Sequence, residues 1–227
     1  MYDTRGSLLK ILCVSDQIDP LVYSNSIKER FANIDLVLCA GDLPLDYLDF
    51  IISSLNKPLF FVYGNHHIEG LKNHSGRLSL LGEESERRHF LEAFHIGSKI
   101  KREQGLIIAG LGGSMRYNRG MNQFNEFEMY MEIIKLLPAL FFHRIFHGRF
   151  VDILLTHAPP RDIHDRKDKC HRGFGAFRWF MKAFKPAYLI HGHIHLYDMS
   201  DVRITQCEKT TVVNAYSHCI INFEKGK

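Results

Sequence analysis

Short apolar runs alternate with segments of helical spacing in the first third of the chain. Continuous apolar runs bounded by polar turns are typical of strands buried on both faces. This pattern predicts strands over residues 8–14, 35–40 and 58–63, with helices over 20–31 and 46–55 between them. A β-α-β-α-β order implies parallel strands joined by right-handed crossovers.

The rest of the chain adds more strands and two longer helical segments. The segments that the pattern predicts are a hairpin over 97–112, helices over 125–147 and 174–184, strands over 151–155 and 187–191, and a β-rich end with strands over 196–205, 211–216 and 219–223. Pro138 is expected to bend or break the long helix. We therefore expect a single α/β domain over residues 1–227, a sandwich with a mixed sheet instead of a purely parallel one.

Composition narrows the class of protein. The 227 residues are 45% apolar and 24% charged, as in soluble globular proteins, and the net charge of +4 is a weak hint of anionic substrates. No long Lys/Arg run indicates nucleic-acid binding, and no apolar stretch suggests a signal peptide, a membrane span or a membrane partner. Five scattered cysteines are typical of reduced thiols, so we expect a cytoplasmic protein.

Residues that bind metals follow five of the predicted strands. They are Asp16, then Asp42, then Asn65 with His66, then His157, and finally His193 with His195. Ligands bind beyond the carboxyl ends of strands in α/β sheets, so these side chains are expected to meet. Asp and His together suit Mn, Fe or Zn, and a pair of metals can hold both the attacking and the leaving oxygen at phosphorus, with Asp42 as the natural bridge.

The order of these motifs resembles that of the calcineurin-like metallophosphoesterases, whose pattern is D-x-H, G-D, G-N-H-[DE], a single His, and G-H-x-H. The chain has Asp16-Gln17-Ile18, Gly41-Asp42, Gly64-Asn65-His66-His67, His157, and Gly192-His193-Ile194-His195. Two positions differ, because Ile18 replaces a histidine and His67 replaces an acidic residue. The resemblance implies an αββα sandwich that hydrolyses phosphate esters.

The resemblance also implies a role for each matching residue. One metal would be bound by Asp16 and His195, the other by Asn65, His157 and His193, and Asp42 would bridge the two. His66 would contact the phosphate and donate a proton to the leaving oxygen, while Asn65 would also orient the substrate.

Asp19 has two interpretations. It could replace the missing histidine as a metal ligand, reaching the first metal from one residue further along the chain. It could instead be the N-cap of the following helix, because Pro20 comes next, at the favoured first helical position. One carboxylate could do both through different oxygens.

Two loops are candidates for substrate contacts. Residues 158–174 leave directly from His157 and are long for a loop, so we expect them to cap the site, with His171 and Arg172 binding substrate. Arg116, in the glycine-rich segment 110–117, could also meet a phosphate.

Two features of the long helix favour structural interpretations. His143 and His147 have the spacing of a metal motif, but they precede Gly148 and are better explained as residues of a helix end. The phenylalanine-rich segment 137–146 is expected to belong to the core.

The most direct functional hypothesis is a phosphoesterase with two divalent metal ions, acting on a small phosphoester as a phosphodiesterase or small-molecule phosphatase. The alternative is an inactive or weakly active scaffold on the same fold, which the loss of a histidine at Ile18 keeps open.

Overall fold

Two mixed sheets form the centre of the protein. The computed structural model describes residues 8–66, 93–198 and 200–224. The first sheet contains, in spatial order, β13 (Ser217–Glu224), β1 (Leu8–Ser15), β2 (Leu36–Cys39), β3 (Leu59–Phe61) and β4 (Ala93–His95). Strands β1 to β4 are parallel, and β13 pairs with β1 antiparallel.

The second sheet also combines a parallel centre with antiparallel edges. Its order is β11 (Ile204–Cys207), β12 (Thr210–Asn214), β10 (Tyr188–His191), β9 (Ile153–Thr156), β6 (Leu106–Leu111) and β5 (Lys99–Glu103). Only β11 and β5 run antiparallel to their neighbours in this sheet of the described chain. A separate pair of short strands, β7 (Ser114–Met115) and β8 (Gln123–Phe124), lies beside it.

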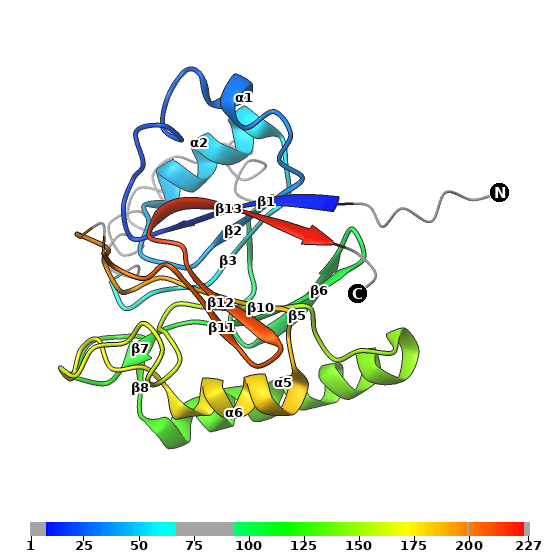
Figure 1. The fold of residues 1–227 in the computed structure, drawn as a ribbon, viewed down its shortest axis with the longest axis vertical. Helices are drawn as coiled ribbons and strands as arrows, with labels where there is room; N and C mark the ends of the chain where they lie inside the picture. The colour runs from blue at the N-terminus through cyan, green and yellow to red at the C-terminus, as the bar shows by residue number, and fades with distance from the viewer. Residues whose placement is uncertain (1–7, 67–92, 199, 225–227) are drawn as a thin grey trace, which may run out of the picture.

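Helices cover the outer faces of both sheets, which gives four layers (Figure 1). The first sheet is covered by α1 (Ile27–Arg30) and α2 (Leu45–Leu55), and the second by α5 (Glu126–His147) and α6 (Gly175–Phe184). Alternate residues of each buried strand enter two different apolar clusters, as the period-two geometry of strands requires. In β6, for example, Ile108 faces the first sheet and Ile107 faces the helices.

The predicted α/β class with mixed sheets and an αββα arrangement is confirmed. The hairpin is β5 and β6, joined by Gln104 and Gly105, which both have positive φ (48° and 86°) as a two-residue hairpin turn requires. Pro138 lies inside α5 without ending it. None of the helices in the described residues is both long and apolar enough to cross a membrane.

Two predicted elements were wrong in extent. The helix predicted over 20–31 is present only as α1, because side chains before it form hydrogen bonds with backbone groups that a helix would need. Asp19 accepts from the amide of Leu21 at 2.8 Å, and Ser24 donates to the carbonyl of Leu21 at 3.0 Å. The strand over 196–205 begins only at Ile204.

The assignment of segment 137–146 to the core was also wrong. Helix α5 contributes Met129, Ile133, Leu136 and Leu140 to the core, on one side of the helix. Phe141, Phe142 and Ile145 face away from it and are 52%, 52% and 75% exposed. The predicted helix end is confirmed, since α5 stops at His147 and Gly148 follows in the left-handed conformation.

Candidate metal centre

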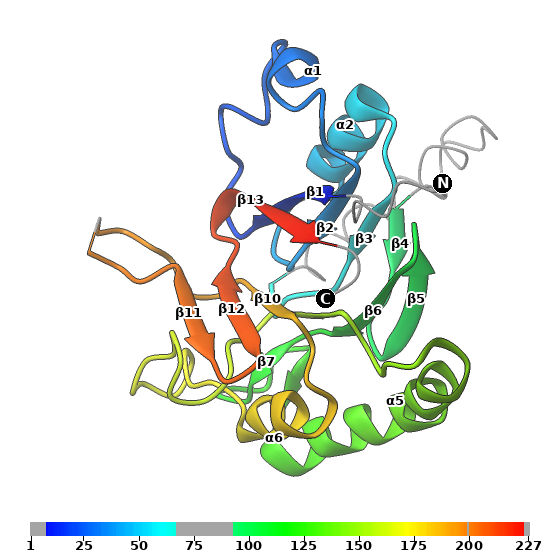
Figure 2. The same ribbon diagram turned by 45° about the vertical axis from the view of Figure 1, so that its right-hand side comes forward.

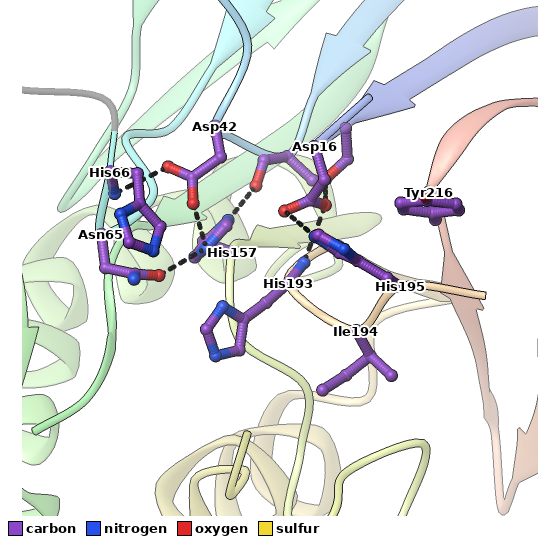
Figure 3. A network of polar contacts seen from close by, with 12 residues as sticks. Asp16, Asp42, Asn65, His66, His157, His193, Ile194, His195 and Tyr216 are labelled. Atoms are coloured by element: carbon purple, nitrogen blue, oxygen red, sulfur yellow. Dashed lines mark hydrogen bonds and ion pairs between the residues drawn. The ribbon is translucent and has the colours of Figure 1, made fainter. Parts of the chain in front are cut away.

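The carboxyl ends of five strands meet at one edge of the two sheets. Figure 3 shows Asp16 after β1, Asp42 after β2, Asn65 and His66 after β3, His157 after β9, and His193 and His195 after β10. The structure therefore brings together the residues that the sequence placed at strand ends.

The backbone bends sharply where three of these side chains leave their strands. Asp16, Asp42 and His193 have φ of 62°, 54° and 67°, in a region that residues other than glycine rarely adopt. Conformations of this kind persist where the surroundings impose them, and they cluster at functional sites. Glycine keeps the space open, because a Cβ on Gly64 would overlap the carboxylate of Asp42, and one on Gly192 would overlap that of Asp16.

A group of three side chains has the geometry of a metal site. Potential ligand atoms of Asp16, Asp42 and His157 all lie within 4.8 Å of one another. The Nδ1 of His157 is 2.8 Å from the carbonyl oxygen of Ala40, which can only accept, so Nδ1 carries a proton. The opposite nitrogen, Nε2, lies 3.0 Å from Oδ1 of Asn65 and 3.2 Å from Oδ2 of Asp42. In the neutral ring, Nε2 is a lone pair facing two oxygens, an arrangement that a cation between them would stabilise.

Electrostatics in the metal-free site agree with that geometry. Burial opposes a charge on His157, but the carboxylate of Asp42 outweighs it and raises the pKa of His157 to about 9. Burial likewise opposes the charge on Asp42, yet the neighbouring His157 lowers the pKa of Asp42 below its usual value. Burial raises the pKa of Asp16. In the metal-free protein, the proton on His157 therefore supplies a positive charge among the buried acids, as a bound metal ion would.

His193 is held in the tautomer that a ligand needs. Its Nε2 is 2.6 Å from the carbonyl oxygen of Cys170, so Nε2 donates and Nδ1 keeps a free lone pair. Its backbone amide donates to Oδ2 of Asp16 at 2.8 Å, and its ring centroid is 4.9 Å from that of His157. Burial lowers the pKa of His193 to about 3, which favours the neutral form. Ligand histidines generally have their other nitrogen bound in this way.

His195 lies on the other side of Asp16. Its Nε2 is 3.9 Å from Oδ1 of Asp16, and its Nδ1 is 2.5 Å from the hydroxyl of Tyr197. The ring stacks on Tyr216 with centroids 4.9 Å apart (Figure 3). The two tyrosines orient His195 toward Asp16, and neither was identified from the sequence because neither belongs to a motif.

The structure directs Asp19 away from this group. Its Oδ1 accepts from the amide of Leu21, and its Oδ2 lies 2.5 Å from both Ser217 Oγ and His218 Nδ1 at the start of β13. Among the described residues, Asp19 is not part of the potential metal group around His157. The helix that Asp19 was expected to cap does not begin there, since α1 starts at Ile27 after Ser26, and the bond from Leu21 to Asp19 closes a turn instead. Ile18 is 40% exposed and carries no ligand atom.

The loop over 158–174 contacts His193 and His195, two of the proposed ligands. Its ends are joined, because the amide of Phe174 donates to Pro159 at 3.1 Å. Between them, Cys170 accepts from His193, and Arg166 donates to the carbonyl of His195 at 2.9 Å. The ring of His171 lies 5.4 Å from that of His193. This loop therefore supports two proposed ligands, and substrate binding by His171 and the exposed Arg172 stays a prediction.

In the segment 110–117, Tyr117 and not the predicted Arg116 contacts a residue of the proposed site. Arg116 forms an ion pair with Glu128 at 2.8 Å, on helix α5. Tyr117 instead lies within 3.2 Å of Nδ2 of Asn65, through its hydroxyl. This bond orients the amide so that Oδ1 of Asn65 faces His157. The sequence identified the segment but not the tyrosine.

Comparisons with known proteins identify the family and the fold. The family model described as calcineurin-like phosphoesterase matches residues 9–197. A structure described as TT1561 of Thermus thermophilus superposes with a TM-score of 0.62 at 12% identity, covering 96% of this chain and 99% of that one. GAP50, described as the anchor in the inner membrane complex of Plasmodium, gives 0.51 at 11% identity, with 91% and 71% covered.

A structure described as a novel archaeal phosphodiesterase gives a TM-score of 0.46 at 15% identity and covers 92% of this chain and 84% of that chain. At these identities the structural neighbours show the fold alone. A search of curated proteins found no match.

Proposed function

The chain belongs to the calcineurin-like phosphoesterase family, and on that premise we propose that it hydrolyses a small phosphate ester with two divalent metal ions. The observation that carries the proposal is the position of Nε2 of His157 between Asp42 and Asn65, with Nδ1 already bound to Ala40. Such a nitrogen is satisfied by a proton or by a metal ion, and the donor set of carboxylate, amide oxygen and imidazole suits Mn, Fe or Zn. Ions bound there would supply a water nucleophile near neutral pH and neutralise phosphate charge.

In this proposal the ligands divide between two adjoining sites. One site would be formed by Asp16 and His195, and the other by Asn65, His157 and His193. Asp42 would serve both sites, because its Oδ2 faces His157 of the second site and its carboxylate lies beside that of Asp16, which faces His195 of the first site. The first site then has three protein ligands, which suits a metal that keeps open positions. It is expected to be the weaker of the two.

His66 is proposed to protonate the leaving oxygen. Its backbone amide donates to Oδ1 of Asp42 at 3.0 Å, which fixes the residue at the mouth of the site, and the residue itself is exposed (Figure 3). General acid catalysis matters most when the leaving group is a poor one. A His66→Ala variant should therefore lose more activity on an alkyl phosphodiester than on bis-p-nitrophenyl phosphate, whose leaving group needs little help. Equal losses on the two substrates would remove His66 from this role.

The proposed function is tested by assaying the protein with Mn²⁺, Fe²⁺ or Zn²⁺ on bis-p-nitrophenyl phosphate and p-nitrophenyl phosphate. Turnover that chelation abolishes and metal restores supports the proposal. Faster turnover of the first substrate indicates a phosphodiesterase, and faster turnover of the second indicates a phosphatase. No turnover with any divalent ion overturns the proposal.

A scaffold function on the same fold is the second candidate. It is favoured by one observation, the absence of a ligand atom at Ile18 together with the engagement of Asp19 by Ser217 and His218. A protein of this kind would bind metal at the His157 site without turning over any phosphoester. Metal analysis beside the activity assay separates the two candidates.

A further inference from the structure

Helix α5 presents an apolar face to the outside of the molecule. It lies on the outer side of the second sheet, and no helix or strand of the described residues covers the side of α5 that faces away from that sheet (Figure 2). Most of its exposed residues are apolar, and we call this set the α5 apolar face. It consists of Phe127, Met131, Ile134, Pro138, Phe141, Phe142, Ile145 and Phe146.

This face is not the usual exterior of a surface helix. A helix that covers a sheet normally carries charged and polar residues on the side away from the core. Here the core side is supplied by other residues, while Ile145, Phe127 and Phe146 remain 75%, 71% and 65% exposed. Large contiguous apolar patches on a protein surface mark sites where something else binds.

The charges around the face have one sign toward its C-terminal end. The sequence from Ile133 to Val151 contains no Asp or Glu, and Lys135 and Arg144 are the two exposed charged residues of α5. The neighbouring helix α6 also lacks acidic residues, and its exposed side carries Lys182 and Arg178, the latter paired with Asp162 of the preceding loop at 3.3 Å. Trp179, between those cations, is 44% exposed, with its ring 5.8 Å from that of Tyr130 on α5.

The acidic residues of α5 are all engaged elsewhere. Its three glutamates lie in the first two turns and bond to Arg161, Arg116 and Lys135, respectively. They are therefore not arranged to meet cations brought by a second molecule.

We propose that the α5 apolar face and the cations of α6 bind the surface of an anionic lipid membrane. Aromatic and aliphatic side chains on one side of a helix, flanked by Lys and Arg, suit a helix lying in the headgroup layer with its apolar residues at the acyl boundary. Exposed tryptophan is favoured at that depth, and cations near the surface attract anionic lipids. The expectation of no membrane partner rested on the lack of a spanning segment, which does not bear on a helix that lies on the surface.

The test is flotation of the full chain with vesicles of phosphatidylcholine alone or with 30% phosphatidylglycerol. We expect binding to the anionic vesicles, weakened by salt. The double variant Phe142→Glu, Phe146→Glu should reduce partition roughly tenfold or more, because it places two charges where apolar rings enter the lipid. Both residues are exposed and lie outside the core, so the variant should fold.

Two control variants and a sedimentation measurement complete the test. Ile204→Glu replaces an apolar residue that is 58% exposed on β11, at the far edge of the sheet, and should bind vesicles like the wild type. Lys182→Glu should weaken binding to anionic vesicles only. Equal binding of the wild type and the double variant, or no flotation with either vesicle, overturns the proposal. So does a wild-type dimer in sedimentation that the double variant dissociates without any vesicle binding, which would assign the face to a second copy of the chain.

Discussion

Replacing Asp42 with asparagine should remove a specific pH dependence from the stability of the metal-free protein. In the wild type, Asp42 lies 3.2 Å from Nε2 of a completely buried His157 and raises the pKa of that histidine to about 9. An unfolded histidine has a pKa of about 6.5. Folding therefore takes up a proton between these two values. The asparagine keeps the shape of the side chain but not the charge, so burial, which lowers the pKa of the histidine, would be opposed only by the weaker effects of Asp16 and the Ala40 carbonyl.

The size and sign of the effect follow from proton linkage. A group whose pKa is raised by folding stabilises the folded protein fully at pH values below its pKa in the unfolded state. That stabilisation is lost as the pH rises through its pKa in the folded state. The interval from 6.5 to about 9 for His157 corresponds to about 3 kcal/mol at 1.36 kcal/mol per pH unit. Without Asp42, the histidine is neutral throughout this interval in both states, and no such loss occurs. The lowered pKa of Asp42 itself acts only in acid and does not enter this range.

The assay is urea unfolding of chelator-treated protein at several pH values between 6 and 9.5. The wild type should lose about 3 kcal/mol of unfolding free energy over this range relative to Asp42→Asn. Differences between the two proteins cancel the titration of groups that do not interact with Asp42 or His157, since those groups behave alike in both. Direct NMR titration of the His157 ring gives an independent value. Parallel stability curves, or a His157 pKa that Asp42→Asn leaves unchanged, would refute the reasoning.

Three further predictions concern the surroundings of the site. Tyr117→Phe removes the hydroxyl beside the Asn65 amide and should lower kcat/KM about fivefold, equivalent to about 1 kcal/mol, whereas Tyr188→Phe, which loses a bond to Asn222 far from the site, should not. Asp19→Asn should lower the unfolding free energy by about 1–2 kcal/mol and leave the number of metals per chain unchanged, and a lost metal would restore Asp19 as a ligand. His171→Ala combined with Arg172→Ala should raise KM with little change in kcat, and an unaltered KM for every accepted substrate would remove these residues from substrate binding.

The sequence predicted most of the fold because buried parallel strands have a simple pattern. Runs such as 36–40 are apolar throughout, and each is followed by a motif residue, which identifies both the strand and its carboxyl end. Elements that depend on side chains bonding to their own backbone were less predictable. Ser24 and Asp19 divert the backbone before α1, and nothing in hydrophobic spacing reports that competition.

The exposed face of α5 was missed for a different reason. Segment 137–146 is apolar on more than one side of a helix, and a sequence alone favours the core for such a segment. The structure shows that the sheet can cover only the side that contains Leu140, which leaves Phe141, Phe142 and Ile145 outside. Which side is covered depends on tertiary packing and not on local pattern.

In the site, motif residues were predictable and their supports were not. The spacing of the motifs identified His157 and His193, but the carbonyl groups that orient them belong to Ala40 and Cys170, from distant parts of the chain. A backbone carbonyl has no sequence signature. The contact of Tyr117 was unpredictable for the same reason, because it joins Tyr117 to Asn65, which is 52 residues away in the sequence.

The most direct test of the metal-centre account is a metal titration of stripped protein, with metal analysis and turnover of bis-p-nitrophenyl phosphate measured on the same samples. For the wild type, turnover should be absent without metal and should rise in step with bound Mn²⁺. For Asp42→Asn, the affinity for Mn²⁺ and the rate of turnover should each fall by at least about 100-fold, because the proposed shared ligand is lost. Turnover by wild type that carries no metal, or an Asp42→Asn variant that binds Mn²⁺ and turns over like the wild type, would contradict the account.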